Sequence, residues 1–333
     1  MTSKLGKFFR LLHISLLLEP RLETTMVIRL GAHWLAFLWD VSTRGPLSDA
    51  VRKARSAGAT VFELIYHALN GLSPSKTADS LKAGGITRAG ECVFFPDGED
   101  GAEPPMGDPL SDNAKQRGLA LKTFRRILGF MVALRAYGIT INLLGGPSCW
   151  VLGKDYGLDW VELRRRILRF YKELEVDLRA AEVRIAIEFL RIEEDLVVQT
   201  PAHAAELVDA LNTAIHGNMF GVLLDTFHVA ERGYDQVATV RTLGKRIIHL
   251  HLNGAKRRPA GGDGDTIQWP ELVVALDELG LERVDATYEP FCALVREKNS
   301  ALGEGLPAPV DEPGGIVTTR ETLTASGMEV VTT

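Results

Sequence analysis

The stretch Gly221–His228, Gly-Val-Leu-Leu-Asp-Thr-Phe-His, carries the pattern on which the fold prediction depends. Its three consecutive apolar residues, Val222–Leu224, are typical of a strand that is buried on both faces of a parallel sheet. Asp225 follows at the point where this strand would end, and His228 is expected on the loop beyond it. Because an unpaired buried carboxylate is very costly, an acid at the end of a buried strand indicates a partner of opposite charge.

Three other segments of the chain end in the same way. Ile-Ala-Ile-Glu ends at Glu188, Ile-Ile-His-Leu-His ends at His251, and Asp-Ala-Thr-Tyr-Glu ends at Glu289. From Glu188 through Asp225 and His251 to Glu289, the successive spacings are 37, 26 and 38 residues, each close to one strand–helix unit. The sequence therefore predicts neighbouring parallel strands whose carboxyl ends carry polar, metal-competent side chains.

Eight strand-like runs alternate with helical segments along the chain. The first four runs are Val27–His33, Thr60–Tyr66, Gly90–Phe95 and Ile139–Leu144, and the last four are those described above. This alternation predicts parallel pairing with right-handed crossovers. Eight repeats in 333 residues fit an α/β fold of the (β/α)8 TIM barrel type, whose active sites lie at the carboxyl ends of the strands.

The predicted barrel, residues 26–302, is flanked by two segments that lack the strand–helix pattern. Residues 1–25 are predicted to be a poorly ordered extension. Their basic start and apolar run loosely imitate a secretory signal, but a histidine in the run and the missing small-residue cleavage site argue against export. Residues 303–333 are rich in Gly, Pro and Thr, which predicts a disordered C-terminal tail. The helix expected to close the barrel between Leu294 and Leu302 is weak in the sequence.

The composition excludes several classes of protein. Apolar residues make up 46% and charged residues 24% of the chain, which are ordinary values for a globular protein with a sizeable core. The net charge is −5 and no basic stripe is present, so nucleic-acid binding is not expected. No apolar run has the roughly 18 residues of a membrane span. Three cysteines without Cys-x-x-Cys spacing indicate a reducing cytoplasm. A homo-oligomer is left open.

Glu188, Asp225, His251 and Glu289 together offer three carboxylates and one imidazole. An oxygen-rich set with one histidine suits Mn²⁺, Mg²⁺ or Co²⁺ better than a metal that prefers thiolates. Any one of these residues alone would more often be an ordinary strand-end group bonded to loop backbone, but four at consecutive strand ends favour a divalent metal. His249 shares a face with His251 and is expected to pack in the core, one layer deeper.

Further side chains are candidates for substrate contacts. His228 is either a substrate contact or a solvated loop histidine. Arg257 belongs to the basic, glycine-rich segment Lys256–Gly262, which could hold the oxygens of a polyol or phosphate or could be a plain surface loop. Glu63, within the second strand, could meet the substrate or pair with a nearby arginine. Trp150 could line the pocket with its apolar face.

Several of these segments resemble the sugar isomerase/epimerase family of xylose isomerase-like barrels, and within it the D-tagatose/D-psicose 3-epimerases. The resemblance extends from about Val27 to Phe291 and is specific from Glu188 onward. The segments that carry it are Ala186–Glu194, Leu224–His228, His249–Arg257 and Tyr288–Phe291. The chain departs from the family at Arg191-Ile192, where Asn-Arg is usual, at Gly254, where an acid is frequent, and in its weak last helix.

The resemblance implies a fold, a cofactor and a chemistry. It implies one divalent metal, often Mn²⁺, held by the four strand-end residues, with Glu194, His228 and Arg257 in contact with the sugar. It also implies an epimerase or isomerase that acts on a ketose or related polyhydroxy carbonyl compound. The reaction would pass through a cis-enediolate, with Glu188 and Glu289 as the acid/base pair.

Other functions stay open on the same barrel. Return of the proton to the neighbouring carbon would give an aldose–ketose or hydroxypyruvate isomerase, and an inosose dehydratase is a further alternative. A barrel that binds a metabolite without turning it over also fits the residues. An apurinic endonuclease is disfavoured, because it would need several more histidines, and Asp263-Gly-Asp265 offers none where one is expected.

Overall fold

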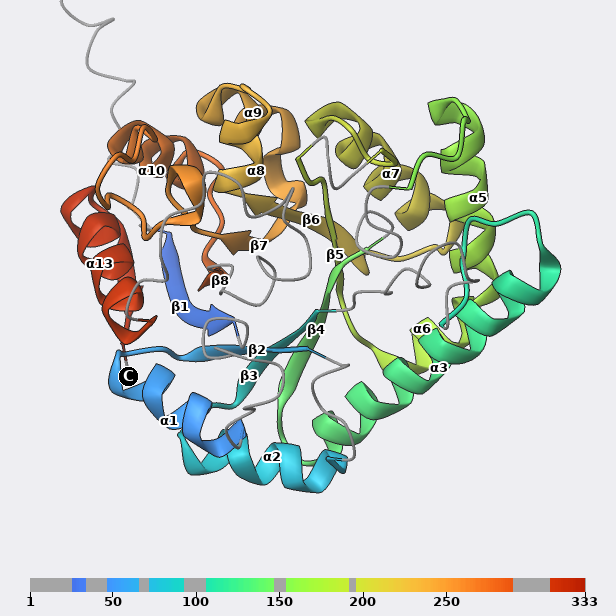
Figure 1. Cartoon of the computed structure of the whole chain (residues 1–333), viewed down its shortest axis with the longest axis horizontal. Coiled ribbons are helices and arrows are strands. Elements are labelled where there is room, and N and C mark those ends of the chain that lie inside the picture. Colours follow the sequence, from blue (N-terminus) through green and yellow to red (C-terminus); the bar gives the residue numbers. More distant parts are fainter. Residues whose placement is uncertain are drawn as a thin grey trace, which may run out of the picture.

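Parallel strands close into a barrel in the computed structural model, which describes residues 26–33, 47–65, 72–92, 106–146, 154–191, 196–289 and 312–332 (Figure 1). In chain order the barrel strands are β1 (Val27–His33), β2 (Val61–Ile65), β3 (Arg88–Cys92), β4 (Thr140–Gly145), β5 (Ile185–Glu188), β6 (Phe220–Asp225), β7 (Ile247–His251) and β8 (Arg283–Tyr288). Each pairs in parallel with the next, and β1 pairs with both β8 and β2. The predicted (β/α)8 barrel is therefore confirmed.

Helices surround the barrel on its outer side (Figure 1). Thr200 caps α7 by accepting a hydrogen bond from the His203 N–H, with Pro201 in the first helical turn. The described helices are α1 (Leu47–Ser56), α2 (Pro74–Ala83), α3 (Ala114–Ala136), α5 (Trp160–Glu173), α6 (Glu175–Ala181), α7 (Pro201–Ala214), α8 (Thr226–Glu231), α9 (Gln236–Leu243), η4 (Gly244–Arg246), η5 (Ala255–Arg257), α10 (Trp269–Asp277) and α13 (Glu312–Ala325).

The apolar core has two parts of unequal size. The larger part lies between the strands and the helices, and the smaller part groups Cys92, Leu144, Ala186, Leu223 and Ile248 from the strands themselves. Gly221 makes room for this second group, because a Cβ at its position would lie 2.4 Å from the Ile248 side chain. Since strand side chains alternate between the two faces, the polar residues above and below this small plug also share the barrel interior.

The expectation of a disordered tail at residues 303–333 is wrong for the part that the structure describes. Helix α13 lies beside α10 and α1 (Figure 1), and β9 (Glu329–Val331) adds to β1 in parallel. The segment has few large apolar side chains, but two of them, Ile316 and Leu323, are almost fully buried and hold it against the barrel. The glycines that suggested disorder permit close packing instead: a Cβ at Gly315 would lie 2.4 Å from the Tyr288 ring. Tertiary packing, rather than helix propensity, stabilises this segment.

The remaining predictions about the ends of the chain lie outside the described residues. These are the poorly ordered extension at 1–25, the weak closing helix at 294–302 and the first part of the tail, 303–311. None of the helices in the described ranges combines the length and the apolar character that crossing a membrane requires.

Candidate active site

Four side chains meet at the carboxyl ends of neighbouring strands. Glu188 ends β5, Asp225 ends β6, His251 ends β7, and Glu289 follows β8 directly. Each offers one ligand atom, all four atoms lie within 4.8 Å of one another, and all four residues are buried. The structure thus brings together the set of residues that the sequence predicts as metal ligands.

His251 lies at the centre of this set and faces carboxylates with both ring nitrogens. Its Nδ1 is 3.0 Å from Glu289 Oε2 and 3.5 Å from Glu188 Oε1. Its Nε2 is 3.2 Å from Glu63 Oε2. A carboxylate behind the second ring nitrogen is the usual device that fixes the tautomer of a metal-binding histidine. A proton kept on Nε2 leaves the Nδ1 lone pair directed at the other three residues.

Asp225 is held in place by the backbone and by Asn253. The Asp225 carboxylate caps α8 by accepting a 2.7 Å hydrogen bond from the Phe227 N–H. Asn253 donates from its side-chain amide to the same carboxylate at 3.3 Å, and its Oδ1 accepts the Glu289 N–H at 3.0 Å. Asn253 therefore fixes two members of the site relative to each other.

The pKa values of the three carboxyl groups are pushed apart. Burial raises the pKa of Asp225 to about 7, and the positive charges of Arg257 and His251 offset only part of this effect. Burial also raises the pKa of Glu188. At Glu289 burial acts in the same direction, but the charges of His251, His33 and Arg257 outweigh it and lower the pKa to about 2.

A bound cation would relieve the repulsion among the three buried carboxyl groups of the site. Three buried carboxyl groups within a few ångströms repel one another when ionised, which is unfavourable unless a positive charge lies among them. Carboxylate oxygens and one imidazole nitrogen are a donor set that hard divalent cations accept. The residues present therefore fit a divalent metal ion.

Glu63 on β2 supports the site from the barrel interior. It is fully buried, its Oε1 lies 2.6 Å from His249 Nε2, and the Thr287 hydroxyl donates to the same oxygen at 2.6 Å. The arginine partner considered from the sequence is not among its contacts in the described part of the chain. Its contacts with His249, Thr287 and His251 place it as a support of the site, and its contact with a substrate stays a prediction. His249 is buried within the barrel, as its position one layer deeper predicts.

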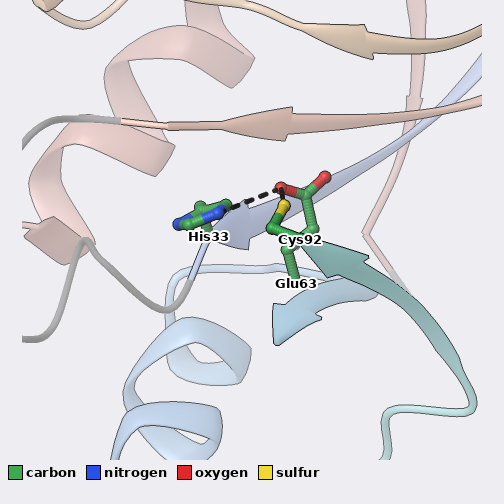
Figure 2. Close-up of side chains that lie close together, drawn as sticks. All are labelled: His33, Glu63 and Cys92. Carbon is green, nitrogen blue, oxygen red and sulfur yellow. Dashed lines mark hydrogen bonds and ion pairs between the residues drawn. The ribbon is translucent and has the colours of Figure 1, made fainter. Parts of the chain in front are cut away.

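His33 and Cys92 approach the same carboxylate from β1 and β3, as Figure 2 shows. Cys92 Sγ and His33 Nε2 both lie 3.8 Å from Glu63 Oε2, and His33 Nε2 lies 3.5 Å from Glu289 Oε1. Neither residue was predicted from the sequence, and nor was Asn253. A signal was available for two of them, because His33 ends the first predicted run and Asn253 follows His251 by two positions. Cys92 lies inside the predicted run Gly90–Phe95 and carries no such signal.

His228 and Arg257 are buried beside the site rather than solvated, so the loop alternatives considered for both are wrong. His228 lies in α8, where its Nδ1 accepts the Arg191 N–H at 2.8 Å. Arg257 packs over the Phe227 ring, 4.4 Å from its centroid, with its Nη2 3.1 Å from His228 Nε2 and its Nη1 3.5 Å from Glu289 Oε2. A guanidinium therefore lies next to one of the candidate ligands. The other predicted substrate contacts, Glu194 and Trp150, lie outside the described residues.

A family model described as xylose isomerase-like TIM barrel matches residues 51–308, which is most of the chain. The chain belongs to this family. The matched range contains all four strand-end residues of the site.

Among curated proteins, the D-psicose 3-epimerase of Enterocloster bolteae is 29% identical over 153 residues, or 45% of this chain and 48% of the relative. The D-psicose 3-epimerase of Ruminiclostridium cellulolyticum is 28% identical over 159 residues, or 47% and 52%. The matched region thus spans about half the length of the curated relatives. A solved D-allulose 3-epimerase from Methylomonas sp. shares the fold, with a TM-score of 0.73, 18% identity, and coverage of 90% of this chain and 98% of that chain.

Proposed function

We propose that this member of the xylose isomerase-like family is a sugar epimerase or isomerase that depends on a divalent metal. Its substrate would be a ketose or a related polyhydroxy carbonyl compound. The observation that carries the proposal is the convergence of Glu188, Asp225, His251 and Glu289 at the carboxyl mouth of the barrel. The curated relatives, which are D-psicose 3-epimerases, support the same class of reaction.

The four residues would hold the metal, and Mn²⁺ is our first candidate, with Mg²⁺ and Co²⁺ as alternatives. The set is rich in oxygen donors and contains one imidazole, which agrees with these ions. A bound divalent metal supplies Lewis-acid polarisation of a carbonyl and of the hydroxyl next to it, which makes the neighbouring C–H more acidic. The tautomer of His251 would be set by Glu63, 3.2 Å from the outer ring nitrogen.

Glu188 and Glu289 are the proposed acid/base pair. They come from β5 and β8, and the two strands between these carry Asp225 and His251, so the two carboxylates reach the mouth from different sides. One would remove the proton from the carbon beside the carbonyl, and the other would return a proton to the opposite face of that carbon. The configuration at that carbon is then inverted. Return of the proton to the neighbouring carbon would instead interconvert an aldose and a ketose.

Arg257 and His228 are proposed to position the substrate. The Arg257 guanidinium is held over Phe227 and lies 3.5 Å from Glu289 Oε2, so it can donate hydrogen bonds to a substrate oxygen beside that carboxylate. His228 is fixed by the Arg191 N–H and contacts Arg257. Sugar contacts by Glu194 and Trp150, and a cytoplasmic location, remain part of the proposal on sequence grounds alone.

Hydrogen exchange tests the proposal across a range of candidate substrates. A panel of ketoses, hydroxypyruvate and inososes is incubated with the chain in D₂O, with Mn²⁺ or with a chelator, and deuterium in the recovered compounds is located by NMR. We expect metal-dependent exchange at the carbon next to the carbonyl of at least one ketose. Absence of exchange across the whole panel with metal present would leave a barrel that binds a metabolite without turning it over.

A further inference from the structure

A cavity opens at the amino ends of the barrel strands, away from the carboxylate site. Its volume is about 450 Å³. Arg29 and Arg88 lie in the first halves of β1 and β3, Arg283 begins β8, and Arg184 directly precedes β5. Arg135, near the end of α3, completes a set of five guanidinium groups that line the cavity. Most of these side chains are carried by the strands themselves, which gives the cavity a rigid frame.

The charges around this cavity do not balance. Among its described lining residues, Asp285 and Glu182 are the only acids. Asp285 is shared by Arg29 and by Arg88, whose Nη2 lies 2.7 Å from the carboxylate. Glu182 pairs with Arg135 at 3.0 Å.

Arg184 and Arg283 make no ion pair or side-chain hydrogen bond with the described part of the chain. Burial lowers the pKa of Arg184, and the charge of Asp285 offsets only part of that effect. Five positive and two negative groups leave a marked positive charge in one concave space. In ordinary TIM barrels the strand interior is filled by layers of branched apolar side chains, so arginines at this level need a different explanation from packing.

We propose that this cavity binds a multiply charged phosphate, either free or as the phosphate end of a nucleotide or sugar phosphate. Guanidinium groups present planar forks of N–H donors that match phosphate oxygens, and here several strands contribute them. Asn142 and Thr140 of β4 line the same space and add neutral hydrogen-bonding groups. The volume lies within the range of small-molecule sites. None of these residues belongs to the carboxylate site, so the proposal does not rest on the proposed function.

Calorimetric titration of the full chain tests the site. The chain is treated with chelator, so that phosphate cannot bind through a metal, and is titrated at low ionic strength with inorganic phosphate, pyrophosphate, a nucleoside triphosphate and citrate. We expect pyrophosphate and the nucleotide to bind more tightly than citrate. The double variant Arg184→Gln/Arg283→Gln should bind about tenfold or more weakly, because two charge-assisted donors are lost. The control Arg246→Gln, which removes an arginine paired with Asp209 outside the cavity, should bind like the unmodified chain.

A variant that is expected to bind pyrophosphate more tightly keeps the test decisive if the double variant folds poorly. Asp285→Asn removes the carboxylate that competes for Arg29 and Arg88, so pyrophosphate should bind several-fold more tightly, which a damaged fold would not produce. Unchanged affinity in the double variant, no phosphate binding at all, or tighter binding of citrate would each overturn the proposal. Loss of binding in Arg257→Gln, which removes the guanidinium beside Glu289, would place the anion at the carboxylate site and would overturn it as well. Hydrogen exchange by the double variant reports on the proposed function separately.

Discussion

At the carboxyl ends of the strands the barrel gathers acids around one imidazole, whereas at the amino ends it gathers guanidinium groups around one shared acid. Strand β8 and the residue after it contribute to both ends. Asp285 lies among the arginines, Thr287 donates a hydrogen bond to Glu63, and Glu289, which follows the strand, lies beside His251. The small apolar plug lies on strands between them. One parallel scaffold can therefore hold two polar sites of opposite charge, because side chains that alternate along a strand reach different depths of the barrel.

The largest effect is expected at the carboxyl end. Glu188→Gln and Glu289→Gln each remove one member of the acid/base pair and leave the volume almost unchanged. Hydrogen exchange with the best ketose of the panel should fall by roughly 10²–10⁴-fold in each variant. Exchange by Glu188→Gln at the rate of the unmodified chain would contradict the assigned roles. Arg246→Gln, on the outer surface, is the matched control.

The next effect concerns the element that borders the amino end. Leu323 of α13 is almost fully buried, and β9, which follows this helix, pairs with β1 at Arg29. Leu323→Ala should lower the free energy of unfolding by about 2–5 kcal/mol, as measured by denaturant titration, because it leaves a cavity. Thr324→Ala, at an exposed position of the same helix, should change it by less than about 0.5 kcal/mol. Equal stability of the two variants would show that α13 is not packed as described.

A smaller effect tests the support beneath the carboxylate site. Glu63→Gln removes the charge behind His251 Nε2, so Mn²⁺ should bind about 10–100-fold more weakly in a calorimetric titration. Glu91→Gln is the matched control, because Glu91 is another buried acid on the neighbouring strand β3. It points to the opposite face from Gly90, which packs against Glu63. Equal losses in both variants would mean that burial of charge, rather than contact with His251, determines the affinity.

The smallest effect concerns Glu91 itself, which belongs to neither end. Burial raises the pKa of Glu91 well above its usual range, and neither carboxyl oxygen has a hydrogen-bond partner among the described residues. Above the unfolded-state value of about 4.3 the unfolded chain releases this proton while the folded chain keeps it. The contribution of Glu91 to stability is therefore full at low pH and is lost as the pH rises through the folded pKa. The free energy of unfolding of Glu91→Gln should rise relative to that of the unmodified chain over that interval. A difference between the two free energies that stays constant from pH 4 to 7 would contradict this.

The sequence predicted most of the fold and the carboxyl end, because both depend on local patterns. Each of Glu188, Asp225 and His251 directly ends an apolar run, and parallel strands carry such ends to one edge. The same rule also indicates His33, which ends the first predicted run, but not Cys92, because Val93–Phe95 follow it in the sequence.

The amino end could not be predicted in this way. Its arginines are spread from Arg29 to Arg283, so they form no basic stripe in the sequence and meet only when the barrel closes. Helix α13 was missed for a related reason. Its glycines and threonines have low helix propensity, and contacts with Tyr288 and with the neighbouring helices, which are distant in sequence, stabilise it.

The proposed function depends most on the divalent metal at the carboxyl end, and an anomalous difference map from crystals grown with Mn²⁺ tests it most directly. We predict one strong peak within bonding distance of Glu188, Asp225, His251 Nδ1 and Glu289, which is absent from crystals of Asp225→Asn. A map without a peak among these four side chains, in crystals whose hydrogen-exchange activity is intact, would contradict the proposed metal site.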